Sequence, residues 1–166
     1  HRESRGLGDV YKRQAYDFDQ SLDEWDITQV KDMLGMLREA SSFNQPIDGW
    51  DTSRLTNMDA IFQAARKFNQ PVDNWNTSLV TSMAFMFCQA TSFDQSIDTW
   101  STSLVTSMNY MFFQASSFNQ CLSTWSEKTP DDVVTTTMLD SSGCPDKSNP
   151  DPTVGPWCQT SDQCTV

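Results

Sequence analysis

The sequence predicts an α/β repeat fold, a solenoid of about five 25-residue coils that each hold a short strand and a short helix. The first observation is that "FNQPIDGWDTS", which begins at Phe43, returns 25 residues later as "FNQPVDNWNTS" at Phe68. The second is that the chain aligns on itself at this period without a gap, which places aromatic residues in two columns, Phe18, Phe43, Phe68, Phe93 and Phe118, and Trp25, Trp50, Trp75, Trp100 and Trp125. The third is that methionine and alanine form further columns, Met33, Met58, Met83 and Met108, and Ala40, Ala65, Ala90 and Ala115. Such a fixed period is typical of proteins whose repeats stack only on their neighbours.

The predicted helix lies in the segment typified by "VTSMAFMFCQA", which begins at Val80. Its apolar residues recur at the spacing of one helix face: Val80, Met83, Met86, Phe87 and Ala90. A helix this short is not stable alone in water, so we expect it to depend on packing. The first residues of the segment fit an extended conformation as well.

The predicted strand lies in "SFNQPIDGW", where Pro46, like Pro71 one repeat later, lacks an amide hydrogen and favours extended geometry in the residue before it. The triplet that follows is "DTS", "NTS" or "STS", and such small oxygen-bearing residues favour turns and helix starts. Stacking turns each column into a ladder. We expect the ladder of Asp19, Asn44, Asn69, Asp94 and Asn119, or the glutamine column beside it, to bond to the backbone of the neighbouring coil, and the methionines to fill the core.

With its F-N-Q-P-I-x-x-W and V-T-x-M-x-x-M-F patterns, residues 18–125 resemble the BspA family of leucine-rich repeat surface proteins. The resemblance implies a right-handed, leucine-rich-repeat-like solenoid in a secreted or surface-anchored protein. It implies adhesion or ligand binding, and it carries over no catalytic residues. The first copy departs from the pattern, and after Trp125 the register slips, because Met138 and Leu139 echo Met111 and Phe112 two residues late. A degenerate last coil is typical of a cap.

The sequence divides into three parts. Residues 1–14 contain no repeat motif, carry a net charge opposite to that of the rest, and resemble the translation of a cloning adapter. The alternative is a genuine basic N-terminal arm; if the segment is non-native, the true N-terminus is missing and the chain is a fragment. Residues 15–140 form the repeat array with its degenerate C-terminal coil, and residues 141–166 form a tail that contains proline and cysteine. We find neither a signal peptide nor an apolar run long enough to span a membrane.

The composition narrows the function classes. The formal net charge is -11 and the sequence pI is about 4.2, so nucleic acid and anionic membranes would be repelled. The only histidine is His1, and there is no glycine-rich phosphate loop. Paired carboxylates recur in every coil, whereas an active site is a unique constellation. We therefore expect no enzyme and no cofactor.

Two surface features are candidate sites. Asp23, Asp48, Asp73 and Asp98 fall in one column, which indicates a soluble acidic rim and a candidate binding face. Calcium or a cationic surface is the alternative partner, although no D-x-D-x-D-G loop is present. Asn76 begins the only glycosylation sequon, Asn76-Thr77-Ser78, at a predicted turn.

Five cysteines leave one without a partner. Cys88 and Cys121 do not recur at the period, and we interpret them as free or structural. Cys144, Cys158 and Cys164 cluster in the tail, where a disulfide between two of the three would indicate an oxidising compartment. Zinc is the alternative, but the spacings and the absence of a nearby histidine fit zinc motifs poorly.

The leading hypothesis is a monomeric, secreted or cell-surface module that binds a protein or carbohydrate through many weak, equally spaced contacts. The alternatives are a structural surface or wall spacer, whose ends polymerise, and an accessory repeat array of a larger protein with further domains.

Overall fold

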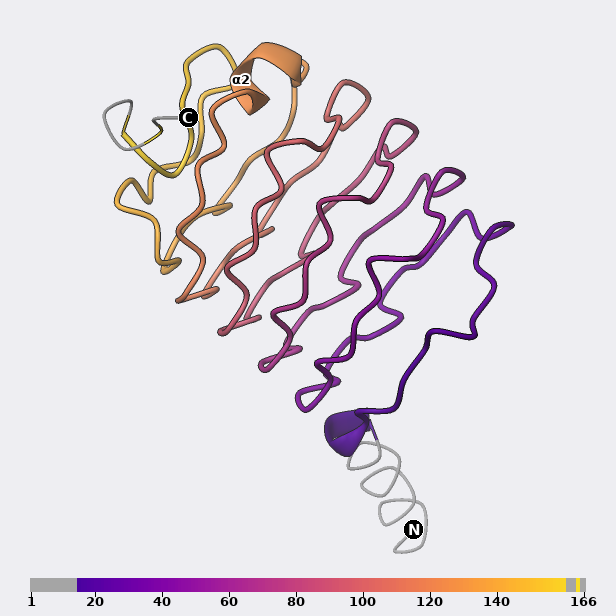
Figure 1. Cartoon of the computed structure of the whole chain (residues 1–166). Helices are drawn as coiled ribbons and strands as arrows, with labels where there is room; N and C mark the ends of the chain where they lie inside the picture. Colours follow the sequence, from indigo (N-terminus) through magenta and orange to yellow (C-terminus); the bar gives the residue numbers. More distant parts are fainter. Residues whose placement is uncertain (1–14, 161–163, 165–166) are drawn as a thin grey trace, which may run out of the picture.

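Each 25-residue repeat forms one coil, and the coils stack side by side along the molecule (Figure 1). The computed structural model describes residues 15–160 and residue 164, so the segment that we interpret as adapter-derived lies outside the described residues. Four parallel bridges join residues one coil apart, in the order Asp32, Asn57, Ser82, Ser107 and Val134. The repeat period therefore equals one circuit of the backbone.

The prediction of a strand and a helix in each coil is wrong. Within the described residues, helix is limited to residues 15–17 and to α2, which spans Trp125–Lys128. The described residues pair only through isolated bridges and form no sheet. The leucine-rich-repeat-like α/β architecture is thereby contradicted, and the coils consist of consecutive turns.

The direction of alternate amides explains why the segment after Val80 is not helical. The N–H groups of Met83, Phe85, Phe87 and Gln89 donate to carbonyl oxygens of the next coil, 24 residues later, at 2.8–3.0 Å. The intervening N–H groups of Met86, Cys88 and Ala90 donate three residues back within the coil. In an α-helix each of these N–H groups would donate to the carbonyl oxygen four residues earlier. The helical spacing of the apolar residues arises instead from a series of tight turns.

These turns place two residues of each coil in the left-handed region. One column has φ between 54° and 63° and holds Gly35, Ala60, Phe85, Tyr110 and Thr137; the other has φ between 58° and 63° and holds Glu39, Ala64, Gln89, Gln114 and Ser141. Residues other than glycine adopt this conformation at a cost of roughly 1–2 kcal/mol each. The hydrogen bonds between coils hold them there, since Phe85 and Gln89 are themselves donors to the next coil.

Side chains replace a backbone ladder in the segment predicted as a strand. Asn69 donates its backbone N–H to the Asn44 Oδ1, and the Asn69 Oδ1 accepts the N–H of Asp94, both at 2.9 Å. The same bond joins Asn44 to Asp19 and Asn119 to Asp94. Glutamine Nε2 groups of Gln45, Gln70, Gln95 and Gln120 reinforce each step. The expectation that these two columns bond coil to coil is confirmed.

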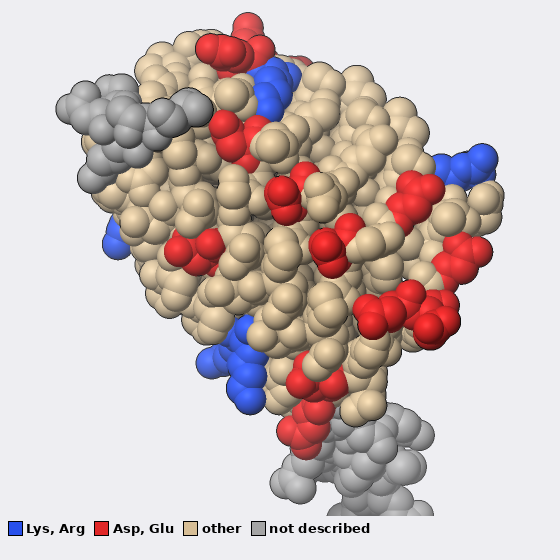
Figure 2. Space-filling model, in the orientation of Figure 1, with Lys and Arg blue, Asp and Glu red and all other residues tan. Residues whose placement is uncertain are grey.

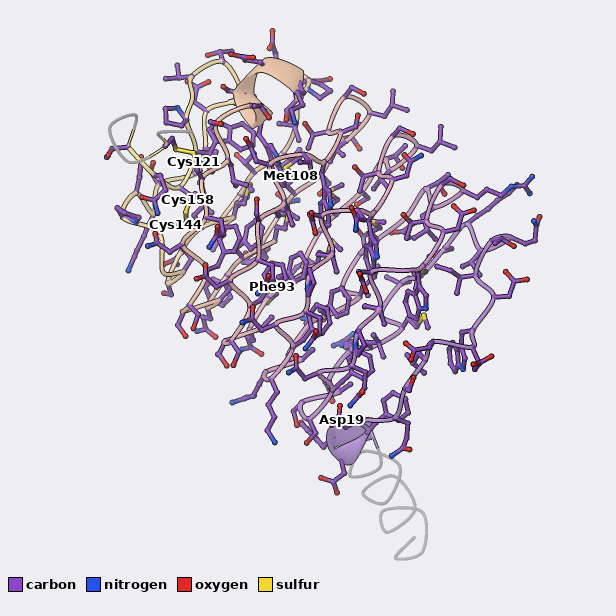
Figure 3. All side chains as sticks on the ribbon, in the orientation of Figure 1. Asp19, Phe93, Met108, Cys121, Cys144 and Cys158 are labelled. Carbon is purple, nitrogen blue, oxygen red and sulfur yellow. A yellow bond between two sulfur atoms is a disulfide. The ribbon has the colours of Figure 1, made fainter. Side chains whose placement is uncertain are left out.

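The interior consists of apolar ladders. Phe43, Phe68, Phe93 and Phe118 stack with ring centroids 6.0 Å apart, and each of the last three also stacks on the ring of Phe62, Phe87 or Phe112 at about 4 Å. Figure 3 places Phe93 inside this core. The indole N–H groups of Trp50, Trp75 and Trp100 donate to carbonyl oxygens of the preceding coil at 3.0–3.3 Å. The stacked rings and the indole hydrogen bonds thus require the same alignment of each coil on the next.

The tail closes the C-terminal end of the stack. The last coil is two residues longer than the others, because the N–H of Phe112 donates to Met138 26 residues later, which confirms the predicted slip. Trp157 forms an antiparallel bridge with Leu122 and packs edge-on against Trp125. At Gly143 a Cβ would come within 2.8 Å of backbone oxygens of Ser116 and Phe118, so only glycine allows this approach.

Replacing Asn69 by alanine should destabilise the fold by about 1–2 kcal/mol, because the N–H of Asp94 loses its acceptor and the amide of Gln95 keeps only the Asn69 backbone carbonyl. The measurement is the free energy of unfolding in urea. Asn74→Ala is the matched control, since Asn74 is exposed in the next turn, and it should change that free energy by less than about 0.5 kcal/mol. Equal effects of the two substitutions would contradict the ladder.

Candidate functional site

The acidic column is the first predicted surface feature. Asp23, Asp48 and Asp73 are exposed, whereas Asp98 is partly buried. Asp98 accepts hydrogen bonds from the Ser123 hydroxyl at 2.9 Å and the Thr124 N–H at 3.1 Å, so it holds the last coil. Figure 2 shows acidic side chains spread across the visible face, with basic ones mainly at its margins. The structure thus leaves three exposed members of the predicted face.

Other carboxylates are engaged locally. The N–H of Asn44 and the amide of Gln45 hold the pKa of Asp19 below its usual value. Hydrogen bonds from Thr28 and Ser53 lower the pKa values of Asp26 and Asp51, respectively. Among the described residues no three His, Cys, Asp or Glu side chains are grouped to hold a metal ion. These carboxylates serve as acceptors in turns and between coils.

The sequon lies at an exposed turn. Asn76 is exposed, and its Oδ1 accepts the N–H of Ser78 at 3.0 Å. Thr77 is buried, and its hydroxyl donates to the Ser101 carbonyl at 2.9 Å. The position therefore presents the asparagine side chain outward while the threonine secures the next coil.

The structure contains two disulfides, both at the C-terminal end (Figure 3). Cys144 pairs with Cys158, with Cα atoms 4.8 Å apart, inside the predicted tail cluster. Cys164 pairs with Cys121, with Cα atoms 5.6 Å apart, so Cys121 ties the tail to a coil. This second pairing is one that the sequence did not indicate, because Cys121 lies in a column otherwise held by Pro46, Pro71 and Ser96. Cys88 is free and buried, and burial raises the pKa of its thiol.

Three aromatic rings that the sequence patterns did not indicate form a surface group, which we call the aromatic ledge: Phe85, Tyr110 and Phe113. All three are partly exposed. Phe85 and Tyr110 stack with centroids 4.8 Å apart and planes within 7°, and Phe113 meets Tyr110 edge-on at 5.7 Å. The signal was the variation within their columns, where the first two coils carry Gly35 and Ala60, or Arg38 and Gln63.

The two ends of the stack differ. Trp25 is 53% exposed, whereas the other four tryptophans of its column are buried. Beside it lies a hollow of about 220 Å³ lined mainly by apolar side chains, among them Phe18, Leu22 and Met36. The first coil therefore shows an apolar face, and the tail covers the last one.

The comparison with protein families matches residues 7–125 to the family described as "Mycoplasma protein of unknown function, DUF285". The chain belongs to this family. The DUF285 match ends at Trp125, so it covers the repeats and leaves out the disulfide-linked tail. Neither the curated proteins nor the solved structures gave a significant match.

No helix within the described part of the DUF285 chain is long and apolar enough to cross a membrane. This finding agrees with the sequence, which contains no apolar run of the required length.

Thiol counting tests the cysteine pairing. The native chain should expose no reactive thiol, and denaturant without reductant should release one, from Cys88, because the other four cysteines are paired. Three or more thiols in denaturant alone would show that a disulfide is missing.

Replacing Cys144 and Cys158 by serine should lower the free energy of unfolding in urea by about 3 kcal/mol. The reason is that this disulfide, between residues 14 apart in the sequence, restricts the conformations of the unfolded chain.

Proposed function

We propose that this chain is a non-enzymatic, secreted or cell-surface module that mediates adhesion or ligand binding through the exposed columns of its coils. The proposal draws on the resemblance between the repeat motifs of this chain and those of the BspA surface proteins. The ligand is a protein or a carbohydrate at a cell surface or in a matrix, and the module acts as a monomer.

The proposal rests on a difference between columns: some form the core and the hydrogen bonds between coils, and others face outward. The phenylalanine and methionine columns are buried from the second coil to the fourth, and the Asn/Asp column is occupied by hydrogen bonds between coils. The outward columns are free to change from coil to coil without loss of these contacts. A rigid stack with changeable outward positions is suited to presenting several weak contacts at fixed spacing, which adds avidity.

The disulfides support the proposed location. Two disulfides secure the tail of this chain, and disulfides persist mainly in oxidising compartments. The absence of an enzymatic role is part of the proposal, since the carboxylates that recur along the stack serve as hydrogen-bond acceptors, as at Asp19, Asp51 and Asp98.

Binding of the full chain to purified extracellular components tests the proposal. The chain would be immobilised through a C-terminal tag and exposed to collagen, fibronectin, laminin, mucin, and neutral and charged polysaccharides. We expect saturable binding to at least one of them, with a stoichiometry of one module per site. If Asp48 and Asp73 take part, Asp48→Asn with Asp73→Asn should weaken binding to a cationic ligand and reduce its salt dependence.

Asp131→Asn with Asp132→Asn is the matched control, because it removes the same charge from exposed positions outside the acidic column. Thermal unfolding of each variant would establish that the fold persists. Failure of the chain to bind any component, at concentrations up to the millimolar range, would contradict a binding role.

A further inference from the structure

The aromatic ledge has a conformational peculiarity. Phe85 and Tyr110 have φ values of 58° and 56°, a region in which bulky residues are rare outliers. The same position in earlier coils holds Gly35 and Ala60, which fit it with less strain. Strained residues persist where the surrounding structure fixes them, and they cluster at functional sites. Thr137 follows in the same column of the last coil, so the column accepts side chains of several kinds and the fold does not require aromatic rings there.

The ledge lies in the uncharged part of an acidic chain. Between Asp73 and Glu127 the only charged residues are Asp94 and Asp98. Both carboxylates accept hydrogen bonds from the next coil, Asp94 from the N–H of Asn119 and Asp98 from Ser123. The equivalent segment of the first coil, 32–39, carries Asp32, Arg38 and Glu39. The corresponding segments of the third and fourth coils, 82–89 and 107–114, carry no charged residue, which favours a neutral ligand at the ledge.

Two side-chain amides follow the rings along the chain. Gln89 and Gln114 lie four residues after Phe85 and Tyr110, and their side chains bond to each other at 2.9 Å. Each side-chain amide has further donor and acceptor capacity. The stack of rings in this column ends at Phe85, because the preceding coil has only the methyl group of Ala60 there. A partly exposed aromatic ring is suited to the C–H face of a sugar, and side-chain amides are suited to its hydroxyls.

We propose that the aromatic ledge of Phe85, Tyr110 and Phe113 is a binding site for a neutral polysaccharide, with a pyranose ring packed on the rings and its hydroxyls bonded to Gln89 and Gln114. This inference rests on the proposed binding function and names its ligand class. The rings are only partly exposed, so a single contact is weak, and retention depends on many sugars along one polymer.

Affinity electrophoresis of the full chain tests the proposal, in native gels cast with soluble neutral polysaccharides: mixed-linkage β-glucan, xyloglucan, galactomannan and dextran. We expect the wild-type chain to be retarded by at least one. Phe85→Gly with Tyr110→Gly should weaken retardation about tenfold, because it removes both rings. Glycine suits the left-handed backbone, so the fold should persist. Ala60→Gly is the matched control, since it makes the same backbone change in the same column without loss of a ring, and it should leave retardation unchanged.

Phe85→Leu with Tyr110→Leu provides a second variant that keeps apolar volume but lacks flat rings, and it should also lose retardation. Wild-type mobility unaffected by every neutral polysaccharide, or glycine and leucine variants retarded like the wild type, would overturn the proposal. The binding assay with matrix components distinguishes failure of the ledge proposal from failure of the proposed binding function. If the chain binds a matrix component but is retarded by no neutral polysaccharide, the ledge proposal is wrong while the binding function stands; if the chain binds nothing in either assay, both are wrong.

Discussion

Hydrogen bonding between successive coils is the constraint on which the rest of the structure depends. In the third coil alternate amides from Met83 to Gln89 donate to the fourth coil, and the side chain of Asn69 supplies an acceptor where the backbone does not. Because each coil satisfies the polar groups of its neighbour, no coil can be stable alone. The left-handed residues and the aromatic ladders follow from this register, and the tail provides bonding partners for the last coil, as when Gln159 donates to the Asn119 carbonyl at 2.7 Å.

This constraint separates the residues that make the fold from those available for function. Phe93 and Met108 are fully buried, and replacing either would disturb its ladder. Phe85 and Tyr110 lie outside the core, and their own backbone conformation favours a smaller residue. The residues that make the repeat easy to recognise are therefore those that pack the core. Positions that differ between coils, such as Ala60 against Phe85, carry the binding surface that we propose.

The sequence was informative about period, core and register, and misleading about local geometry. The 25-residue columns, the Asn/Asp ladder and the two-residue slip before Met138 could be predicted because each depends on residue type at a fixed interval. The helix predicted from Val80 is wrong because tight turns with left-handed residues reproduce the three-residue apolar spacing. Non-glycine residues such as Phe85 give no warning of such turns. The Cys121–Cys164 bond depends on where the tail folds back, which no periodic pattern encodes.

Scalar couplings across hydrogen bonds, measured by NMR on the ¹⁵N,¹³C-labelled chain, test the central claim most directly. The structure predicts a coupling between the amide nitrogen of Phe87 and the carbonyl carbon of Met111, whose oxygen accepts this N–H at 2.9 Å. The equivalent coupling is expected from Phe62 to Met86. A coupling from the Phe87 amide to the carbonyl of Met83, four residues back, would show an α-helix within the coil and contradict the account.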